Sequence, residues 1–250
     1  MERIGIIGYG EIGKAMARVC KEAGYKVMIR ELKYDEIGKN HIDYLHVCIP
    51  EKERSVFVNI VRRAIRELKP RLSVINSSVS VGTTRKIFRK TNSPIVHSPI
   101  VGVHPYLYDS IKYHFRKIIG PVDGLSLGLA REHFKRLGLK VEIYDSPENS
   151  EAAKLLDLVY YTWNIIFCKW VNETCKKTGL NFDQVYVKHN RNYNKGYAKL
   201  RPNVVRPILV HTKGPIGGHC TIPDTELFHK TFKNRFTGFI LRENRRYKLE

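Results

Sequence analysis

Short apolar runs alternate with longer amphipathic segments over the first 144 residues of this chain. The apolar runs have the length of buried strands and are bounded by glycine, proline or polar clusters. They predict strands at residues 3–7, 26–30, 43–50, 72–76, 94–96, 116–119 and 141–144, and the segments between them predict helices at 15–23, 56–68 and 125–137. This alternation predicts a doubly wound α/β fold, in which helices cover both faces of a parallel sheet and sites lie at the carboxyl ends of the strands.

The pattern changes after the turn-rich stretch 145–150. Residues 151–178 contain no glycine or proline and carry apolar side chains on most faces of a helix. A helix of this kind is buried on several sides, so it lies at a hinge, at a subunit interface or within the core of one chain. We expect an α/β domain over 1–146, a mainly helical second domain over 147–250, and a homodimer built across the long helix.

The first predicted strand leads into a glycine turn, Gly8-Tyr-Gly10-Glu-Ile-Gly13, and then a helix. In a Rossmann-type domain such glycines allow a tight turn, close approach of a pyrophosphate and close packing of helix on strand. The second strand ends at Glu31, an acid that can accept hydrogen bonds from a ribose diol. These residues predict a dinucleotide site that prefers NAD, although Arg30 and Lys33 leave NADP as an alternative.

The chain is strongly basic. Its 44 Lys and Arg against 24 Asp and Glu give a formal charge of +20, so we expect a small anionic substrate. Cations alternate with aromatic residues over 230–236 and 242–248. That pattern is compatible with a nucleic-acid surface, but no known nucleic-acid module accompanies it, and we do not expect nucleic-acid binding.

The five cysteines are scattered without CxxC spacing, which argues against a disulfide framework or a zinc site, and we expect no metal. No apolar run reaches the length of about 18 residues that a membrane span requires. The N-terminus leads directly into a strand, unlike a signal peptide. We therefore expect a cytoplasmic protein without membrane association.

One cysteine has distinctive surroundings, in the segment Gly214-Pro-Ile-Gly-Gly-His-Cys220 followed by Asp224. Flexible backbone beside a thiol and a carboxylate suits covalent chemistry, although a buried cysteine after a turn would look the same. Lys154, near the start of the long helix, is a candidate donor to a developing oxyanion. The alternative is a lysine whose stem packs on apolar neighbours while its charge reaches water.

Four motifs fall in an order that resembles the UDP-glucose/GDP-mannose dehydrogenase family, and most of all its UDP-N-acetylmannosamine dehydrogenase branch. They are the glycine turn, Asn76-Ser-Ser-Val-Ser-Val-Gly-Thr-Thr84, Glu151-Ala-Ala-Lys154, and Gly214–Cys220 with Asp224. The resemblance covers about residues 1–225, within a broader 6-phosphogluconate dehydrogenase-like superfamily. It implies that Cys220 forms a thiohemiacetal with an aldehyde intermediate, that Lys154 steadies the oxyanion, and that Asp224 manages water and protons.

Three departures affect the substrate side of this resemblance. The family's Ser-Pro-Glu-Arg motif is Ser98-Pro-Ile-Val101 here, and Leu158 replaces a polar Asn. The chain also ends 26 residues after Asp224, where the family continues into a domain that holds the nucleotide sugar. We therefore expect a truncated member that acts on a compact anionic hydroxy compound and not on a nucleotide sugar.

The segment from His97 to Pro105 also resembles one in prephenate dehydrogenases, which makes His97 a candidate acid or base; the alternative is a strand-end histidine bonded to backbone. Pro50, Ser77 and Ser78 complete the candidate cofactor site. Its members are Gly8, Tyr9, Gly10, Glu11, Ile12, Gly13, Glu31, Pro50, Ser77 and Ser78. The leading function is an NAD-dependent dehydrogenase. A cofactor-binding protein without that activity and an S-adenosylmethionine-dependent methyltransferase remain as alternatives.

Overall fold

A computed structural model describes residues 1–247, and the contacts within the chain divide it into two compact units, Met1–Leu155 and Leu156–Glu250. The predicted domain boundary at 146/147 falls where the long helix α6 (Pro147–Thr178) begins, whereas the division between the units falls inside that helix.

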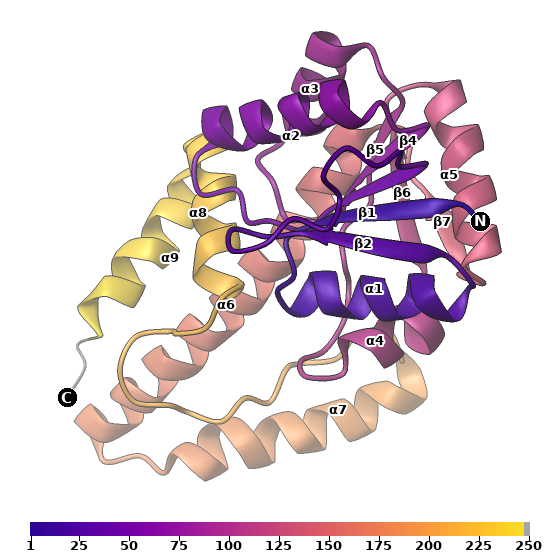
Figure 1. Ribbon diagram of the computed structural model, residues 1–250. Coiled ribbons are helices and arrows are strands. Elements are labelled where there is room, and N and C mark those ends of the chain that lie inside the picture. Colours follow the sequence, from indigo (N-terminus) through magenta and orange to yellow (C-terminus); the bar gives the residue numbers. More distant parts are fainter. Residues whose placement is uncertain (248–250) are drawn as a thin grey trace. The chain divides into compact units, whose positions relative to one another are not determined.

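The first unit contains a seven-stranded sheet in the order β2-β1-β3-β4-β5-β6-β7 (Figure 1). The strands are β1 (Arg3–Ile7), β2 (Lys26–Arg30), β3 (Tyr44–Val47), β4 (Leu72–Ile75), β5 (Ile95–His97), β6 (Lys117–Pro121) and β7 (Val141–Ile143). Strands β1 to β5 are parallel, and the order reverses direction at β1, between β2 and β3. Ligands bind beside such a reversal, beyond the carboxyl ends of the strands.

Helices cover both faces of this sheet (Figure 1). One core lies under α1 (Glu11–Glu22), α4 (Leu107–Asp109), η1 (Ser110–His114) and α5 (Gly124–Arg136). The other lies under α2 (Arg54–Leu68) and α3 (Thr83–Thr91). Because strand side chains alternate between faces, Ile4 and Ile6 pack in the first core and Ile7 in the second.

The predicted fold class is confirmed, with one difference in the sheet. Strand β6 runs antiparallel to β5, with Val96 opposite Pro121. The connection between them holds only the short segment α4 and η1, which packs beside α1 and does not carry the chain back to the start of β5. A parallel neighbour is usually reached through a crossover helix that packs on the sheet, and this connection contains only two short helical segments. Strand β7 then pairs parallel with β6.

The second unit is helical in the described residues, as predicted. It contains most of α6, then η2 (Asp183–Lys188), α7 (His189–Leu200), α8 (Thr221–Phe232) and α9 (Arg235–Arg246). Two small apolar clusters hold it together, one around Cys168 and Tyr186 and one around Val159 and Ile240. Among residues 1–247, no helix combines the length and the apolar character needed to cross a membrane.

Candidate functional site

The turn between β1 and α1 and the first turn of α1 together hold three glycines with different surroundings. Gly8 has a φ of +91°, and a Cβ there would lie 2.8 Å from Ile49, so the position requires glycine. A Cβ on Gly13 would overlap the carbonyl oxygen of Gly8, so Gly13 lets α1 pack closely on β1. Gly10 has an extended conformation, and a Cβ there would meet no atom within 4 Å. The first and third glycines therefore serve the fold, whereas the space above Gly10 is open.

The carboxylate of Glu31 lies beside this turn. Its Oε1 accepts a hydrogen bond from the Tyr9 N–H at 2.6 Å, and its Oε2 accepts one from the Leu32 N–H at 2.9 Å. These backbone hydrogen bonds hold the pKa of Glu31 below its ordinary value, so the group is charged at neutral pH. A charged acid at the end of β2, next to the start of α1, suits the recognition of a ribose diol.

Arg30 is engaged by two acids of its own. Its Nε lies 3.0 Å from Oδ2 of Asp35, and one terminal nitrogen lies 2.9 Å from Oε1 of Glu67. A cavity of about 400 Å³ borders this cluster and is lined also by Ile7 and Ile60. The guanidinium is therefore held by carboxylates and is not presented as an anion-binding group.

The remaining candidate cofactor residues follow β3 and β4. Pro50 is exposed, Ser78 is half-buried, and Ser77 is buried with its hydroxyl donating to the Ile49 carbonyl at 2.6 Å. Carboxyl ends of adjacent parallel strands meet at one edge of a sheet. The fold thus brings these residues to the same edge as the glycine turn and Glu31.

His97, at the end of β5, lies in the interior. Its Nδ1 lies 2.7 Å from the Ser150 hydroxyl, and its Nε2 lies 3.2 Å from the Ser77 carbonyl oxygen. A carbonyl only accepts, so Nε2 carries the proton and Nδ1 accepts from Ser150. Burial lowers the pKa of His97 to about 3, which keeps the ring neutral. These contacts match the alternative of a strand-end histidine that connects β5 to α6, and we give His97 no chemical role.

Lys154 lies on α6 at the end of the first unit and is half-buried. One turn earlier, Glu151 is fully buried and accepts hydrogen bonds from the N–H groups of Gly82 at 2.5 Å and Thr84 at 2.8 Å. Glu151 therefore caps the N-terminus of α3 from a different helix. Burial raises the pKa of Glu151 to about 7.

Cys220 and Asp224 lie together at the start of α8 in the second unit. Cys220 immediately precedes the helix and is half-buried, and the Asp224 N–H donates to the Cys220 carbonyl at 2.9 Å. Asp224 is 5% exposed. Cys220 is thus the N-cap residue of a 12-residue helix, and Asp224 is the acid in its first turn. The predicted chemical residues thus belong to both units, with Lys154 in the first.

Sequence reasoning missed Lys117, the first residue of β6, which is 4% exposed. Its Nζ donates to the Asn76 side-chain oxygen at 3.1 Å, to the Pro99 carbonyl at 3.2 Å and to the Ser98 carbonyl. The available signal was a lysine directly before the apolar pair Ile118 and Ile119. That signal is weak, because the first residue of a strand usually reaches solvent.

No protein-family model and no curated protein matches this chain. Several solved structures resemble it. The UDP-D-ManNAc dehydrogenase from Pyrococcus horikoshii is 19% identical with a TM-score of 0.79, over 98% of this chain and 68% of that one. A UDP-glucose dehydrogenase from Pyrobaculum islandicum is 16% identical with a TM-score of 0.77, over the same shares.

A third structure has nearly the same length as this chain. The 3-hydroxyisobutyrate dehydrogenase from Mycobacterium tuberculosis is 14% identical with a TM-score of 0.70, over 97% of this chain and 92% of that one. At these identities the likeness establishes the fold. The predicted resemblance to UDP-glucose/GDP-mannose dehydrogenases is therefore confirmed in the fold, which this chain shares with hydroxy-acid and sugar-nucleotide dehydrogenases.

Proposed function

We propose that this protein is an NAD-dependent oxidoreductase that acts on a small anionic hydroxy compound. The observation that carries the proposal is the open N-terminus of α1 above Gly10, with the charged carboxylate of Glu31 held beside it by the Tyr9 N–H. Helix N-terminal amides attract a pyrophosphate, and the acid suits a ribose diol. The likeness to dehydrogenase folds supports the same cofactor.

NAD is favoured over NADP by the charges near the ribose position. A 2′-phosphate would be repelled by Glu31, and the neighbouring Arg30 is already paired with Asp35 and Glu67. Neutralising a 2′-phosphate would require breaking those ion pairs. We therefore expect NAD to bind more tightly than NADP.

The proposed substrate class rests on charge and on the solved structures. A formal charge of +20 favours an anionic substrate. A structure that is covered over 92% of its own length is named as a 3-hydroxyisobutyrate dehydrogenase, whose substrate is a small hydroxy acid. Ile100 and Leu158 stand where the sugar-nucleotide family has Glu and Asn, which supports a different substrate.

In the proposed reaction, the hydroxyl proton passes to water as hydride departs from the same carbon, and Lys154 stabilises the developing oxyanion. Bound NAD would supply the hydride acceptor. If the product is an aldehyde, the Cys220 thiolate adds to its carbonyl carbon, and a second hydride would pass to a second NAD that has replaced the NADH formed first, which leaves a thioester. Water then hydrolyses the thioester to the acid, with Asp224 as the candidate for proton transfer. We expect Cys220→Ser to retain NAD binding and to lose this second oxidation.

The test of the cofactor is the melting temperature with NAD, NADP or S-adenosylmethionine. A ligand that binds only the folded state raises this temperature by mass action. We expect the largest rise with NAD. No shift with either nicotinamide cofactor would contradict the proposal, and a shift with S-adenosylmethionine alone would favour the methyltransferase alternative.

A second candidate is a cofactor-binding protein without dehydrogenase activity. The observation in its favour is the loss of the family's Glu and Asn at Ile100 and Leu158. The two candidates are distinguished by mixing the protein with NAD and a panel of small hydroxy acids and measuring NADH, which only a dehydrogenase forms. NAD binding without NADH from any member of the panel would favour the second candidate.

We also propose a homodimer built across α6. Tyr160 and Trp170 on this helix are 57% and 54% exposed, beside Leu156 and Phe167 on the same helix. Large apolar side chains in a row on one helix are typical of a subunit interface. Light scattering should give twice the chain mass, and Trp170→Lys should shift the protein towards monomer; a monomeric wild type would contradict this.

A further inference from the structure

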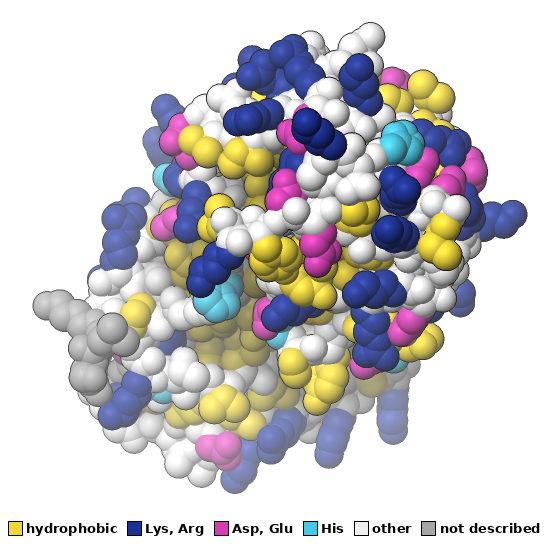
Figure 2. Space-filling model, viewed as in Figure 1, with side chains coloured by type: hydrophobic (Ala, Val, Ile, Leu, Met, Phe, Trp, Pro, Cys, Tyr) yellow, Lys and Arg dark blue, Asp and Glu magenta, His cyan; other side chains and the backbone are white. Residues whose placement is uncertain are grey.

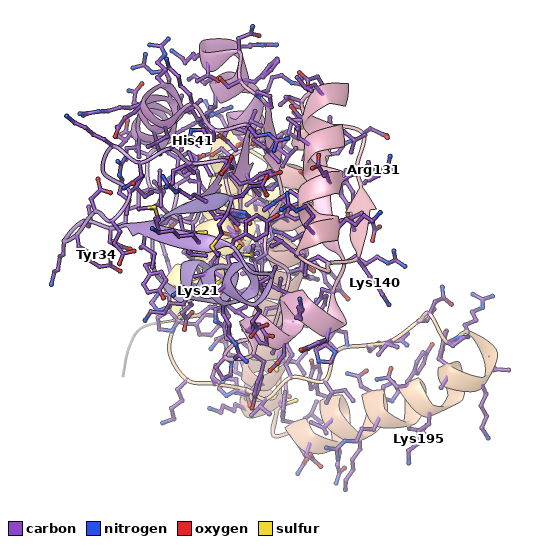
Figure 3. All side chains as sticks on the ribbon, turned by 45° about the vertical axis from the view of Figure 1, so that its right-hand side comes forward. Lys21, Tyr34, His41, Arg131, Lys140 and Lys195 are labelled. Carbon is purple, nitrogen blue, oxygen red and sulfur yellow. The ribbon has the colours of Figure 1, made fainter. Side chains whose placement is uncertain are left out.

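Lys117 is a lysine inside the protein. Figure 3 shows Arg131 and Lys140 of the same unit with their side chains directed outward, as is usual for cations, whereas Lys117 is 4% exposed. Lysine is almost never fully buried unless its charge is compensated. The position of this cation therefore calls for a physical reason.

The acceptors around the Lys117 nitrogen match a protonated amine. The nitrogen donates to three oxygens, which are the Asn76 side-chain oxygen and the carbonyls of Ser98 and Pro99. An ammonium group has three N–H donors and no acceptor, whereas a neutral amine has two donors and a lone pair. Only the ammonium form satisfies all three oxygens, and loss of its proton leaves one of them without a donor.

These three oxygens belong to two neighbouring strand ends. Asn76 directly follows β4 and precedes Ser77, while Ser98 and Pro99 directly follow β5. The two segments are also bonded to each other, because the Ile100 N–H donates to the Asn76 carbonyl at 3.3 Å. Lys117 thus connects the segments at the edge of the sheet where the candidate cofactor residues lie.

A chain of polar groups continues from Asn76 into the core. Because Lys117 only donates, the Asn76 oxygen faces it, and the Asn76 amide nitrogen faces His46 Nδ1 at 3.1 Å. His46 then carries its proton on Nε2, which lies 2.9 Å from His133 Nε2. Burial lowers the pKa of His46 to about 3, so this imidazole stays neutral and adds no charge beside Lys117.

We infer that Lys117, in its ammonium form, is a positioning residue for the dinucleotide site, holding the segments after β4 and β5 in the arrangement that binds the cofactor. The inference rests on the proposed function. The inference predicts that the affinity for the dinucleotide is high when Lys117 is protonated and falls when it loses its proton, although Lys117 is buried and does not contact the ligand.

The surroundings of Lys117 place its titration in an accessible range of pH. Burial lowers the pKa of Lys117 to about 7, and the charge of Lys154 contributes to this lowering. Burial also raises the pKa of the nearby thiols of Cys20 and Cys48, that of Cys48 to about 12, so neither thiol supplies a negative charge near neutrality. His97 and His133 are likewise neutral because burial lowers their pKa.

The first test needs no cofactor. Hydrogen exchange of the unliganded protein should be faster in Lys117→Met than in wild type at the amides of Asn76, Ser98 and Ile100, which bond between the strand ends. Lys112→Met is the matched control, because it also removes a lysine bond to a backbone carbonyl, that of Leu137 at 2.9 Å. Unchanged exchange at these amides in a folded Lys117→Met protein would overturn the inference.

The second test is NAD affinity by calorimetry from about pH 6 to about pH 9. For wild type we expect the affinity for NAD to fall roughly tenfold across this range, which corresponds to about 1.4 kcal/mol of binding free energy. Asn76→Asp places a carboxylate beside the ammonium, so the midpoint of the fall should move to higher pH. Lys117→Met should bind NAD weakly, with no such fall.

The outcomes separate the inference from the function on which it rests. If wild type binds no NAD at any pH, the proposed function is wrong. If wild type binds NAD with an affinity that does not change with pH, or if Lys117→Met binds it as well as wild type does, the positioning role alone is overturned. The wild-type profile and Asn76→Asp keep the test valid even if Lys117→Met does not fold.

Discussion

Glycines that look equivalent in the sequence differ in what they do for the fold. Gly13→Ala would place a Cβ onto the carbonyl oxygen of Gly8, so α1 must move away from β1. We expect a loss of stability of about 1–3 kcal/mol, the usual cost of overpacking. Urea denaturation measures this change.

Gly128 provides the matched control. It lies inside α5, is exposed, and a Cβ there would meet no atom within 4 Å. Gly128→Ala should therefore stabilise the protein by about 0.5–1 kcal/mol, because alanine is the better helix residue. Equal effects of the two substitutions would contradict the packing assigned to Gly13.

Glu31 is predicted to recognise the cofactor by its charge. Glu31→Gln keeps the shape of the side chain and loses the negative acceptor, so NAD affinity should fall roughly tenfold, as for a hydrogen bond to a charged group. Glu36→Gln is the control, since Glu36 also accepts a backbone N–H, that of Ile29 at 3.0 Å. Calorimetric affinities that fall equally in both variants would remove the specific role of Glu31.

At the residue scale, the sequence predicted the glycine turn and Glu31 because backbone demands and a strand end restrict those positions to a few residue types. It could not predict Lys117 or the neutral state of His97. Both depend on which side chains from distant strands and helices enclose them, such as Ser150 beside His97 and Asn76 beside Lys117. The local pattern of apolar and polar residues carries no information about which distant residues bury a side chain.

At the scale of elements, α3 depends on carboxylates from outside its own sequence. Its N-terminal cap, Gly82, offers no side chain, and the acceptors come from Glu151 and, through Ser80 and Thr83, from Glu51. The buried carboxylate of Glu151 accepts hydrogen bonds from the N–H groups at the start of α3, and it thereby also joins α6 to α3. The stability of this connection should therefore depend on pH.

Glu151 has a folded pKa of about 7 against an ordinary value of 4.5. Between these values the folded state holds a proton that the unfolded state has released, so the contribution of Glu151 to stability falls as pH rises through this window. Glu151→Gln cannot titrate. The free energy of unfolding of wild type minus that of Glu151→Gln should thus decrease from about pH 4.5 to about pH 7; a constant difference would refute the burial of Glu151.

The sequence predicted β1 and β2 with their observed ends, because strong apolar runs are bounded there by charged residues or glycine. It did not predict α4, α7 or the antiparallel β6. Helix α7 has no buried residue, so its sequence lacks an apolar stripe, and the direction of β6 depends on where the preceding segment packs. These features follow from tertiary packing and leave no periodic signal.

At the scale of the whole molecule, the charge is distributed and not confined to one region of the face in view. Figure 2 shows Lys and Arg side chains singly and in small groups on that face, interspersed with acidic ones. On this face, such a distribution fits a general attraction for anions and forms no large continuous basic patch. The prediction of no nucleic-acid binding stays a prediction, and a salt-dependent shift of a labelled oligonucleotide would contradict it.

The order of four motifs was enough to predict the fold, although the identity to the three solved structures named above is only 14–19%. The backbone requirements of a fold persist at such low sequence identity, because they depend on the shape of the chain. Substrate recognition does not persist in the same way, as Ile100 and Leu158 illustrate. The fold is therefore established, while the reaction rests on the proposed cofactor site.

The most direct test of that site is NAD binding by calorimetry to wild type and to Gly10→Val. A side chain at position 10 meets no protein atom within 4 Å and needs no positive φ, so the variant should fold with a loss of at most about 1 kcal/mol. The same side chain occupies the space assigned to the pyrophosphate. We predict that wild type binds NAD and that folded Gly10→Val does not; equal binding by both, or none by wild type, would contradict the account.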